Sequence, residues 1–363
     1  MIRGPVLALL FVVLPTSAGA VEWDFFPPRF DGAGIVLVPK AYHSSQDDFG
    51  VGLEAIRPFR TPLQGDLSVD SEFTVKGRLH TTGHGSAEAV ATVYFGKGTW
   101  FLKSKVEFET LARRFWGLGS DSPESNEETY RPQSLLAYVE LFHRVFDGFR
   151  VGGRVEWNDF RYLETEDGGL LDTRDYPGLC CDNAAGAGIV WEWDGRDNLY
   201  APSSGVHAQG FALFFSEDMS GDFAFQNYHL DFRSYHDLGG GNVLALQAFT
   251  FALFGDPPIW RYAAVGGRAH SRGYQRGRFL ERRMAAVQAE WRRPLIGRLD
   301  GVAFGGLANV APAYNDFKLG TMRPTVGVGL RLHATEDRDL LIRADLAVGE
   351  ESIEGDLSFG HAF

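Results

Sequence analysis

The chain has 363 residues and a net charge of −12 at neutral pH, which argues against a nucleic-acid partner because phosphates bind to basic surfaces. It contains 44 glycines, 29 phenylalanines and 8 tryptophans, but nowhere the roughly 20 consecutive apolar residues that a membrane-spanning helix requires. The composition leaves two classes of all-β protein. One is a secreted β-sheet protein, and the other is a membrane β-barrel with aromatic girdles.

The first twenty residues have the pattern of a secretory signal peptide. Arg3 precedes an apolar run over residues 5–14, and small residues close the segment at Ala18-Gly19-Ala20. Cleavage is expected near Ala20, so that residues 1–20 are removed as the chain leaves the cytoplasm. Residues 21–32 are too few for a separate domain and are predicted to form a short periplasmic leader.

Residues 33–363 are predicted to form one transmembrane β-barrel of about sixteen antiparallel strands. Apolar and polar side chains alternate along the strand-like segments, as in strands with lipid on one face and a polar lumen on the other. Short connections at the periplasmic end alternate with long polar ones outside, such as residues 110–128 and 255–280. The segments are 33–42, 49–59, 66–80, 86–95, 98–109, 130–145, 148–160, 186–194, 205–216, 222–236, 241–254, 281–294, 299–312, 323–333, 338–348 and 353–363.

The face opposite the apolar one carries both signs of charge. Arg150, Arg154 and Glu156 alternate with Val151 and Val155, for example. Mixed charge of this kind favours a lumen filled by ion pairs over a wide selective pore.

One segment departs from simple alternation. Residues 266–274 read Gly-Gly-Arg-Ala-His-Ser-Arg-Gly-Tyr and lie in the long connection before the last five strand segments. Arg272-Gly273-Tyr274 resembles the loop-six motif of the Omp85 superfamily, the outer-membrane barrels that include the BamA and TamA assembly proteins and the bacterial surface antigens. That family also has five strands after this loop. Further matches in the family's order are Asp194-Gly-Arg196-Asp197-Asn198 with Pro202 and Gly205, Glu290-Trp-Arg-Arg-Pro294, Gly327-Val-Gly-Leu-Arg331 and the terminal Phe363.

The resemblance implies a position for Arg272. In the family the loop-six arginine folds back into the lumen and meets acidic groups of the wall, and here Glu290 and Asp345 are the candidate partners. Arg272 would then either simply hold the loop inside the barrel or take part in barrel opening. The sequence departs from the family at Gly306, where an acidic residue is expected, and no POTRA domains precede the barrel.

The C-terminal segment resembles the signal by which outer-membrane barrels are recognised for insertion. Leu357, Phe359 and Phe363 occupy its alternate apolar positions, which implies the barrel-assembly machinery as a partner during biogenesis. Cys180 and Cys181 are adjacent, and a strained disulfide, an intermolecular bridge and unpaired thiols all stay open. We expect no metal and no cofactor.

The resemblance implies an outer-membrane protein that assists the insertion, translocation or organisation of outer-membrane components. Its partners would be client proteins or lipids, in a membrane of phospholipid and lipopolysaccharide. A passive channel or a structural surface protein is the alternative. A lipid-acting enzyme is less favoured, because neighbouring residues such as His270-Ser271 seldom make a working dyad and no other catalytic set is evident.

Overall fold

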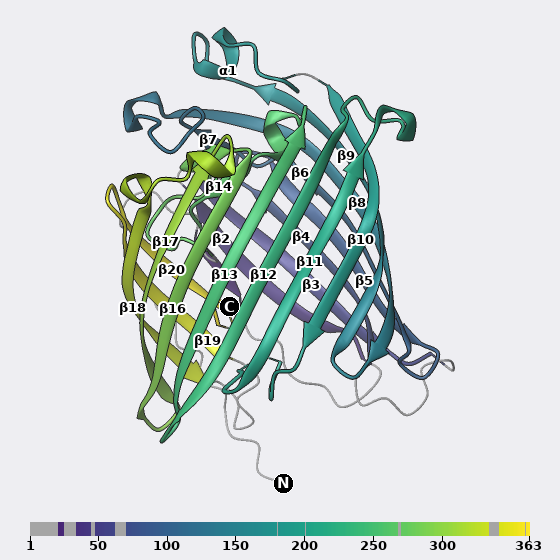
Figure 1. The fold of residues 1–363 in the computed structure, drawn as a ribbon, viewed down its shortest axis with the longest axis vertical. Helices are drawn as coiled ribbons and strands as arrows, with labels where there is room; N and C mark the ends of the chain where they lie inside the picture. Colours follow the sequence, from purple (N-terminus) through teal and green to yellow (C-terminus); the bar gives the residue numbers. More distant parts are fainter. Residues whose placement is uncertain are drawn as a thin grey trace.

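The computed structural model describes residues 21–24, 34–44, 48–61, 70–179, 181–199, 201–267, 270–333, 341–359 and 361–363. Within these ranges, sixteen tilted strands form the wall of a β-barrel, each antiparallel to its neighbours (Figure 1). This confirms the predicted fold class. The wall strands are β2 (Val36–Ser44), β3 (Asp48–Phe59), β4 (Ser71–His80), β5 (Gly85–Phe95), β6 (Trp100–Glu109), β8 (Glu128–Phe146), β9 (Phe149–Glu164), β10 (Asp182–Asp194), β11 (Gly205–Phe215), β12 (Phe225–Gly239), β13 (Asn242–Gly255), β16 (Arg283–Ile296), β17 (Leu299–Ala311), β18 (Arg323–His333), β19 (Leu341–Val348) and β20 (Ile353–Phe359).

The alternation of side chains explains why these segments form the wall. On β19, Leu346 and Val348 are exposed on the outer face, whereas Arg343 and Asp345, at the alternate positions before them, are buried inside. A shift of the strand by one residue would move both charges into the lipid layer, so the pattern also fixes the register.

The two ends of the barrel differ, and we call them the turn end and the loop end. At the turn end, neighbouring strands are joined by tight turns that contain Gly148 and Gly297, whose φ angles of 81° and 58° favour glycine. None of the helices within the described ranges is long and apolar enough to cross a membrane. The loop end (top of Figure 1) carries the remaining elements: β7 (Arg113–Phe115), η1 (Glu124–Asn126), α1 (Leu170–Thr173), η2 (Glu217–Met219), η3 (Ile259–Arg261), β14 (Ala263–Val265), β15 (Phe279–Glu281), η4 (Tyr314–Asp316) and η5 (Leu319–Thr321).

The barrel closes through β1 (Val21–Asp24). This strand pairs with the edge of β2 that faces away from β3, and β20 lies against it. Four residues of the predicted leader are thus part of the wall, whereas the predicted signal peptide and residues 25–32 lie outside the described residues. We call the junction of β20, β1 and β2 the seam. Within the described residues, β1 has 4 residues and β20 has 7, compared with 19 in β8.

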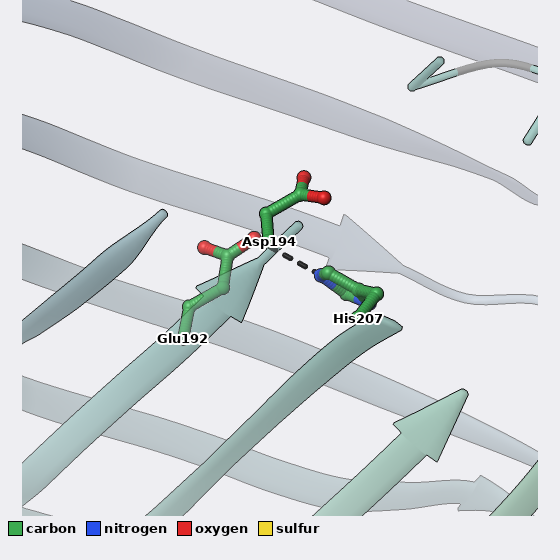
Figure 2. Close-up of side chains that lie close together, drawn as sticks. All are labelled: Glu192, Asp194 and His207. Atoms are coloured by element: carbon green, nitrogen blue, oxygen red, sulfur yellow. Dashed lines mark hydrogen bonds and ion pairs between the residues drawn. The ribbon is translucent and has the colours of Figure 1, made fainter. Parts of the chain in front are cut away.

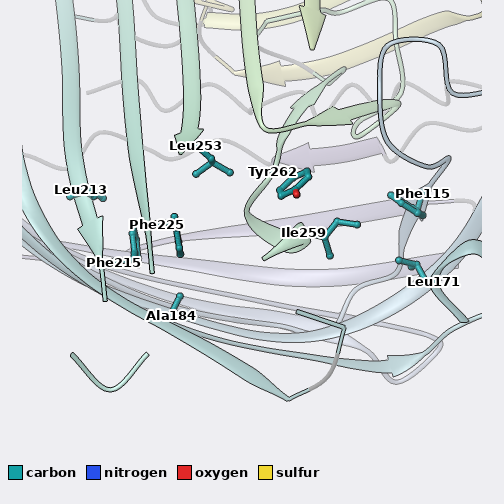
Figure 3. Close-up of a cluster of buried hydrophobic side chains, with 9 residues drawn as sticks. All are labelled: Phe115, Leu171, Ala184, Leu213, Phe215, Phe225, Leu253, Ile259 and Tyr262. Atoms are coloured by element: carbon teal, nitrogen blue, oxygen red, sulfur yellow. The ribbon is translucent and has the colours of Figure 1, made fainter. Parts of the chain in front are cut away.

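A cluster of buried apolar side chains lies near the loop end of the barrel (Figure 3). Phe115, Leu171, Ile259 and Tyr262 come from the loops, and they pack against residues near the ends of the strands. We call this cluster the cap. Burying each large apolar side chain in it contributes roughly 1.5–3 kcal/mol, so the cluster anchors these loops to the wall strands. Its wall members are Ala184, Leu213, Phe215, Phe225 and Leu253.

The C-terminal segment turns into the barrel instead of continuing as a strand. β20 ends at Phe359, and the buried Phe363 packs against Tyr235 and Ala245 on the inner face of β12 and β13. The predicted strand to residue 363 is therefore four residues too long. The cause is an inward contact, since Arg292 Nη2 donates a hydrogen bond to the backbone oxygen of Phe363 at 2.8 Å.

Candidate functional site

The candidate site is built by the connection between β13 and β16, which we call loop six. Its strands β14 and β15 form a short hairpin in which Val265 pairs with Phe279. Both side chains are fully buried and pack with Tyr274 against Met284 and other inward residues of β16 and β17. Hydrophobic packing therefore places loop six against the inner face of the wall. Arg268 and Ala269 lie outside the described residues.

Arg272 lies at the centre of a buried polar network. Its Nη1 donates to Glu290 Oε2 at 2.7 Å and to Asp345 Oδ2 at 2.9 Å. The guanidinium carbon lies 3.4 Å from the ring centroid of Phe304, and Nη2 lies 3.5 Å from Gln288 Oε1. The structure thus brings together Arg272 and both carboxylates proposed from the sequence, which come from β16 and β19. A guanidinium removed from water requires such partners.

Two further arginines share the same carboxylates. Arg331 of β18 donates to Asp345, and its Nη2 also lies 3.4 Å from Glu290 Oε2. Arg292 Nε donates to Glu290 Oε1 at 2.9 Å. We call Arg272, Arg292, Arg331, Glu290 and Asp345 the arginine network. It links loop six to β16, β18 and β19, on the side of the wall that leads to β20.

The other two residues of the motif fix the backbone of loop six. A side chain on Gly273 would bring its Cβ within 2.6 Å of the backbone of Val348 and Gly349, so only glycine allows this close approach. Tyr274 Oη donates to the carbonyl of Pro324 at 3.0 Å and accepts from the N–H of Glu350 at 3.1 Å. Gly273 and Tyr274 therefore join the loop to the ends of β18 and β19.

The family pattern has an acidic residue where this chain has Gly306, and Arg272 finds its carboxylates elsewhere. The Arg272 guanidinium stacks on Phe304 and takes its carboxylates from Glu290 and Asp345. Gly329 leaves the room that Asp345 needs, because a Cβ there would lie 2.0 Å from Asp345 Oδ1.

Sequence reasoning missed Arg292, Arg331 and Phe304 as members of this site. The match at Gly327-Val-Gly-Leu-Arg331 pointed to Arg331, but it did not indicate which carboxylate Arg331 contacts.

The predicted turn motif joins β10 to β11 at the turn end. Arg196 Nη2 and Nε pair with the two Asp194 oxygens at 2.7 and 2.8 Å. Asp197 accepts from the N–H groups of Asn198 and Ser203 at 2.9 and 3.0 Å, and from the Ser203 hydroxyl. Burial alone would raise the pKa of Asp197, but these hydrogen bonds hold it below its usual value. The motif residues are thus brought together as a rigid turn, and Arg292 of the arginine network contacts it by donating to the carbonyl of Pro202 at 3.3 Å.

One group near this turn has the residue types of a metal site. Glu192, Asp194 and His207 place one potential ligand atom each within 4.8 Å of one another (Figure 2). His207 Nε2 lies 3.1 Å from Glu192, whose other oxygen accepts from Arg150 at 2.8 Å. Each carboxylate is already paired with a guanidinium, so the group has no excess negative charge to attract a cation. It is best described as an ion-pair cluster of the lumen wall.

The remaining predicted residues have separate positions. Leu357 is half-buried on β20, the side chain of Phe359 lies outside the described residues, and Phe363 is in the lumen. Their role as an insertion signal stays a prediction. Cys180 also lies outside the described residues, and Cys181 is exposed in the connection to β10.

No protein-family model matches the sequence, and no curated protein matches it. Solved structures do match. BamA from Haemophilus ducreyi lacking POTRA domains 1–3 is similar over 90% of this chain and 70% of that chain, with a TM-score of 0.62 and 12% sequence identity. CdiB from Acinetobacter baumannii is similar over 94% of this chain and 58% of that chain, with a TM-score of 0.51 and 12% identity.

This chain therefore spans less than two thirds of the CdiB chain. At 12% identity, the similarity concerns the fold, which agrees with the loop-six motif and with the five wall strands that follow it. The chain therefore has the β-barrel fold of the solved BamA and CdiB structures.

Proposed function

We propose that this protein assists the insertion, translocation or organisation of other outer-membrane components by opening at its seam. The observation that carries the proposal is the position of the arginine network. Arg272 joins loop six to Asp345 on β19, and β19 pairs directly with the seam strand β20. A change in loop six would therefore act on the strands beside the seam.

The short strands of the seam support opening at this place. Each backbone group left unpaired in lipid costs several kcal/mol, so a wall opens where the fewest hydrogen bonds break. In the part of the chain that the structure describes, β1 has 4 residues and β20 has 7, so this junction should separate more easily than the pair formed by β8 and β9. An open edge can then accept a strand of a client protein by β-augmentation.

The proposal includes a location and partners. The predicted signal peptide, with cleavage near Ala20, would direct the chain across the inner membrane. The barrel-assembly machinery would then insert it, with Leu357, Phe359 and Phe363 as the recognition signal. The apolar side chains exposed on the outer face of the wall strands, such as Leu346 and Val348, would lie among phospholipids and lipopolysaccharide, and clients would approach through this surface.

Photo-crosslinking at the seam tests the proposal. A photoreactive amino acid at Ile353, which is exposed on β20, is expected to form adducts with outer-membrane proteins or lipids in cells. The matched control carries the same group at Val287, which is exposed to a similar extent on β16 in the middle of the wall. Client adducts at position 353 that are absent at position 287 would support seam opening. Equal adduct patterns at the two positions, or no adducts at either, would contradict it.

The alternatives receive less support from the described residues. A wide passive channel is disfavoured by the cap, whose buried apolar side chains bring loop residues against the wall at the loop end. An enzyme based on His270 and Ser271 is not supported either. His270 packs on Phe249, with ring centroids 3.8 Å apart, whereas Ser271 Oγ lies 3.4 Å from Thr325 Oγ1.

A further inference from the structure

The inner face of β2 to β6 carries a chain of lysines and glutamates in which each residue contacts the next. These contacts are salt bridges of 3.5 Å or less. Positive and negative charges therefore balance along this part of the wall. In order of contact, the members are Lys40, Glu54, Lys76, Glu88, Lys105 and Glu107.

This balance ends at Glu109, the last residue of β6. Nε and Nη2 of Arg113, in β7, donate to Glu109 Oε1 at 3.3 and 2.9 Å. Nη2 of Arg78, in β4, donates to Glu109 Oε2 at 3.3 Å. The side chains of Arg113 and Arg78 are 35% and 27% exposed. One carboxylate thus holds two guanidiniums, and both of them remain partly accessible to solvent.

Loop six brings a third arginine to this place. Gln275 accepts a hydrogen bond from Arg114 Nη1 at 2.5 Å, and a Cβ on Gly277 would lie 3.7 Å from the carbonyl oxygen of Arg114. These contacts place Arg276, which stands between them in the sequence, beside β7. Its side chain is exposed, and within the described residues it makes no hydrogen bond and no salt bridge.

The surroundings of Arg276 disfavour its positive charge. Incomplete hydration inside the barrel and repulsion by Arg113 and Arg78 lower its pKa. Glu109 and Glu107 attract Arg276, but their attraction does not offset these effects. Glu107 already belongs to the balanced chain, and both oxygens of Glu109 accept from the other two arginines. Among Arg78, Arg113, Arg276 and Glu109, three positive charges therefore face one negative charge.

We propose that Arg78, Arg113 and Arg276 form an anion site in the lumen that binds a phosphate group. A phosphate dianion would compensate the unbalanced positive charge, and its oxygens suit the fork of N–H donors on a guanidinium. Because all three side chains are accessible to solvent, a phosphate can reach them while Glu109 keeps its hydrogen bonds. Glu109 is a positioning residue, since it holds two of the three arginines. The site goes beyond the function proposed above and does not depend on the seam.

Isothermal titration of the purified full-length barrel in non-ionic detergent micelles tests this assignment. The probes are inorganic phosphate and dihexanoyl phosphatidic acid, in about 0.15 M NaCl to screen weak nonspecific attraction. At least one probe is expected to bind the wild type, and Arg276→Gln should bind it at least about tenfold more weakly. Binding of inorganic phosphate would identify a free phosphate compound as the ligand. Binding of phosphatidic acid alone would identify a lipid headgroup.

Arg293→Gln is the matched control, because it removes the same charge from an exposed side chain of β16 near the turn end. This variant should bind the probe like the wild type. The assignment is overturned if neither probe binds the wild type, or if Arg276→Gln and Arg293→Gln bind equally.

Thermal unfolding separates binding from a structural role of Arg276. Because its neighbours repel this arginine, Arg276→Gln should not lower the unfolding midpoint when no probe is present. The bound probe should raise the midpoint of the wild type and of Arg293→Gln more than that of Arg276→Gln. A lower midpoint of Arg276→Gln without a probe would also overturn the assignment, because it would show that Arg276 supports the fold.

Discussion

At the scale of single residues, Glu290 is the side chain on which the arginine network depends most. It is fully buried and faces Arg272, Arg292 and Arg331. Glu290→Gln would remove one of the buried carboxylates that compensate the positive charge of these guanidiniums. Breaking a buried pair from one side typically costs about 3–5 kcal/mol, and we expect a loss of stability of this size in urea unfolding of the barrel in lipid vesicles.

Glu127→Gln is the control for this substitution. Glu127 pairs with Arg114 at 3.1 Å but its side chain is 38% exposed, so its loss should cost less than about 1 kcal/mol. Equal losses in the two variants would show that the network does not stabilise the barrel.

Gly329 tests the packing of the same network without a change of charge. In Gly329→Ala, the added Cβ would lie 2.0 Å from Asp345 Oδ1, so the carboxylate must move away from Arg272 and Arg331. Overpacking of this kind costs about 1–3 kcal/mol, measured in the same unfolding experiment. Gly355→Ala on β20 is the control, because a Cβ there meets no atom within 4 Å. If both variants unfold at the same urea concentration, Gly329 has no special role.

The sequence predicted part of this site. Arg272 came from the loop-six motif, and Glu290 and Asp345 came from the alternation that turns them inward. Arg331 also lies on an inward face, but alternation does not tell which inward residues of β16, β18 and β19 meet. That depends on the stagger of neighbouring strands, which pairs Gly329 with Asp345 and which no local pattern encodes.

At the scale of elements, the C-terminal segment shows where the pattern fails. Leu357, Phe359 and Phe363 occupy alternate positions, with His361 in place of an apolar residue, so the sequence predicts one strand to residue 363. In the structure, β20 ends at Phe359 because Phe363 finds an apolar pocket formed by Tyr235 and Ala245 and a hydrogen bond from Arg292. A long-range contact therefore overrides the local preference for a strand.

This contact is expected to hold β20 in place. Arg292→Gln removes the guanidinium that binds the Phe363 oxygen, so the amides of β20 should exchange hydrogen with the solvent faster than in the wild type. Arg293→Gln is the matched control, because Arg293 is exposed and its guanidinium lies 5.9 Å from the Trp291 ring centroid. Hydrogen exchange measured by mass spectrometry compares the two. If β20 is equally protected in both, the segment does not hold the strand.

At the scale of the whole molecule, the cap predicts low conductance. Wild-type protein in planar bilayers should show small currents, because apolar side chains of the loops pack against the wall at the loop end and narrow the opening there. Ile259→Asp places a charge in the cap, where Ile259 is buried, and should raise the conductance severalfold. Leu319→Asp is the control, since Leu319 is 89% exposed in η5 and should conduct like the wild type. Large steady currents from the wild type would contradict a closed cap and favour the passive channel.

The sixteen wall strands could be predicted because a barrel in lipid imposes period-two alternation on every strand. The order of short turns and long loops follows from the same architecture. Neither the closure through β1 nor the cap could be predicted in this way. Both depend on contacts between segments far apart in the chain, such as Phe115 with Leu171 and Ile259.

The central claim is that the barrel acts on other envelope components through loop six and the seam. The most direct test compares the outer-membrane proteins and lipids of cells that lack the gene, after complementation with wild type or with Arg272→Ala. We predict selective loss of particular barrels, lipoproteins or lipids, restored by the wild type and not by an Arg272→Ala protein that still reaches the membrane at normal levels. An envelope that stays unchanged without the gene, or that Arg272→Ala restores fully, would contradict the claim.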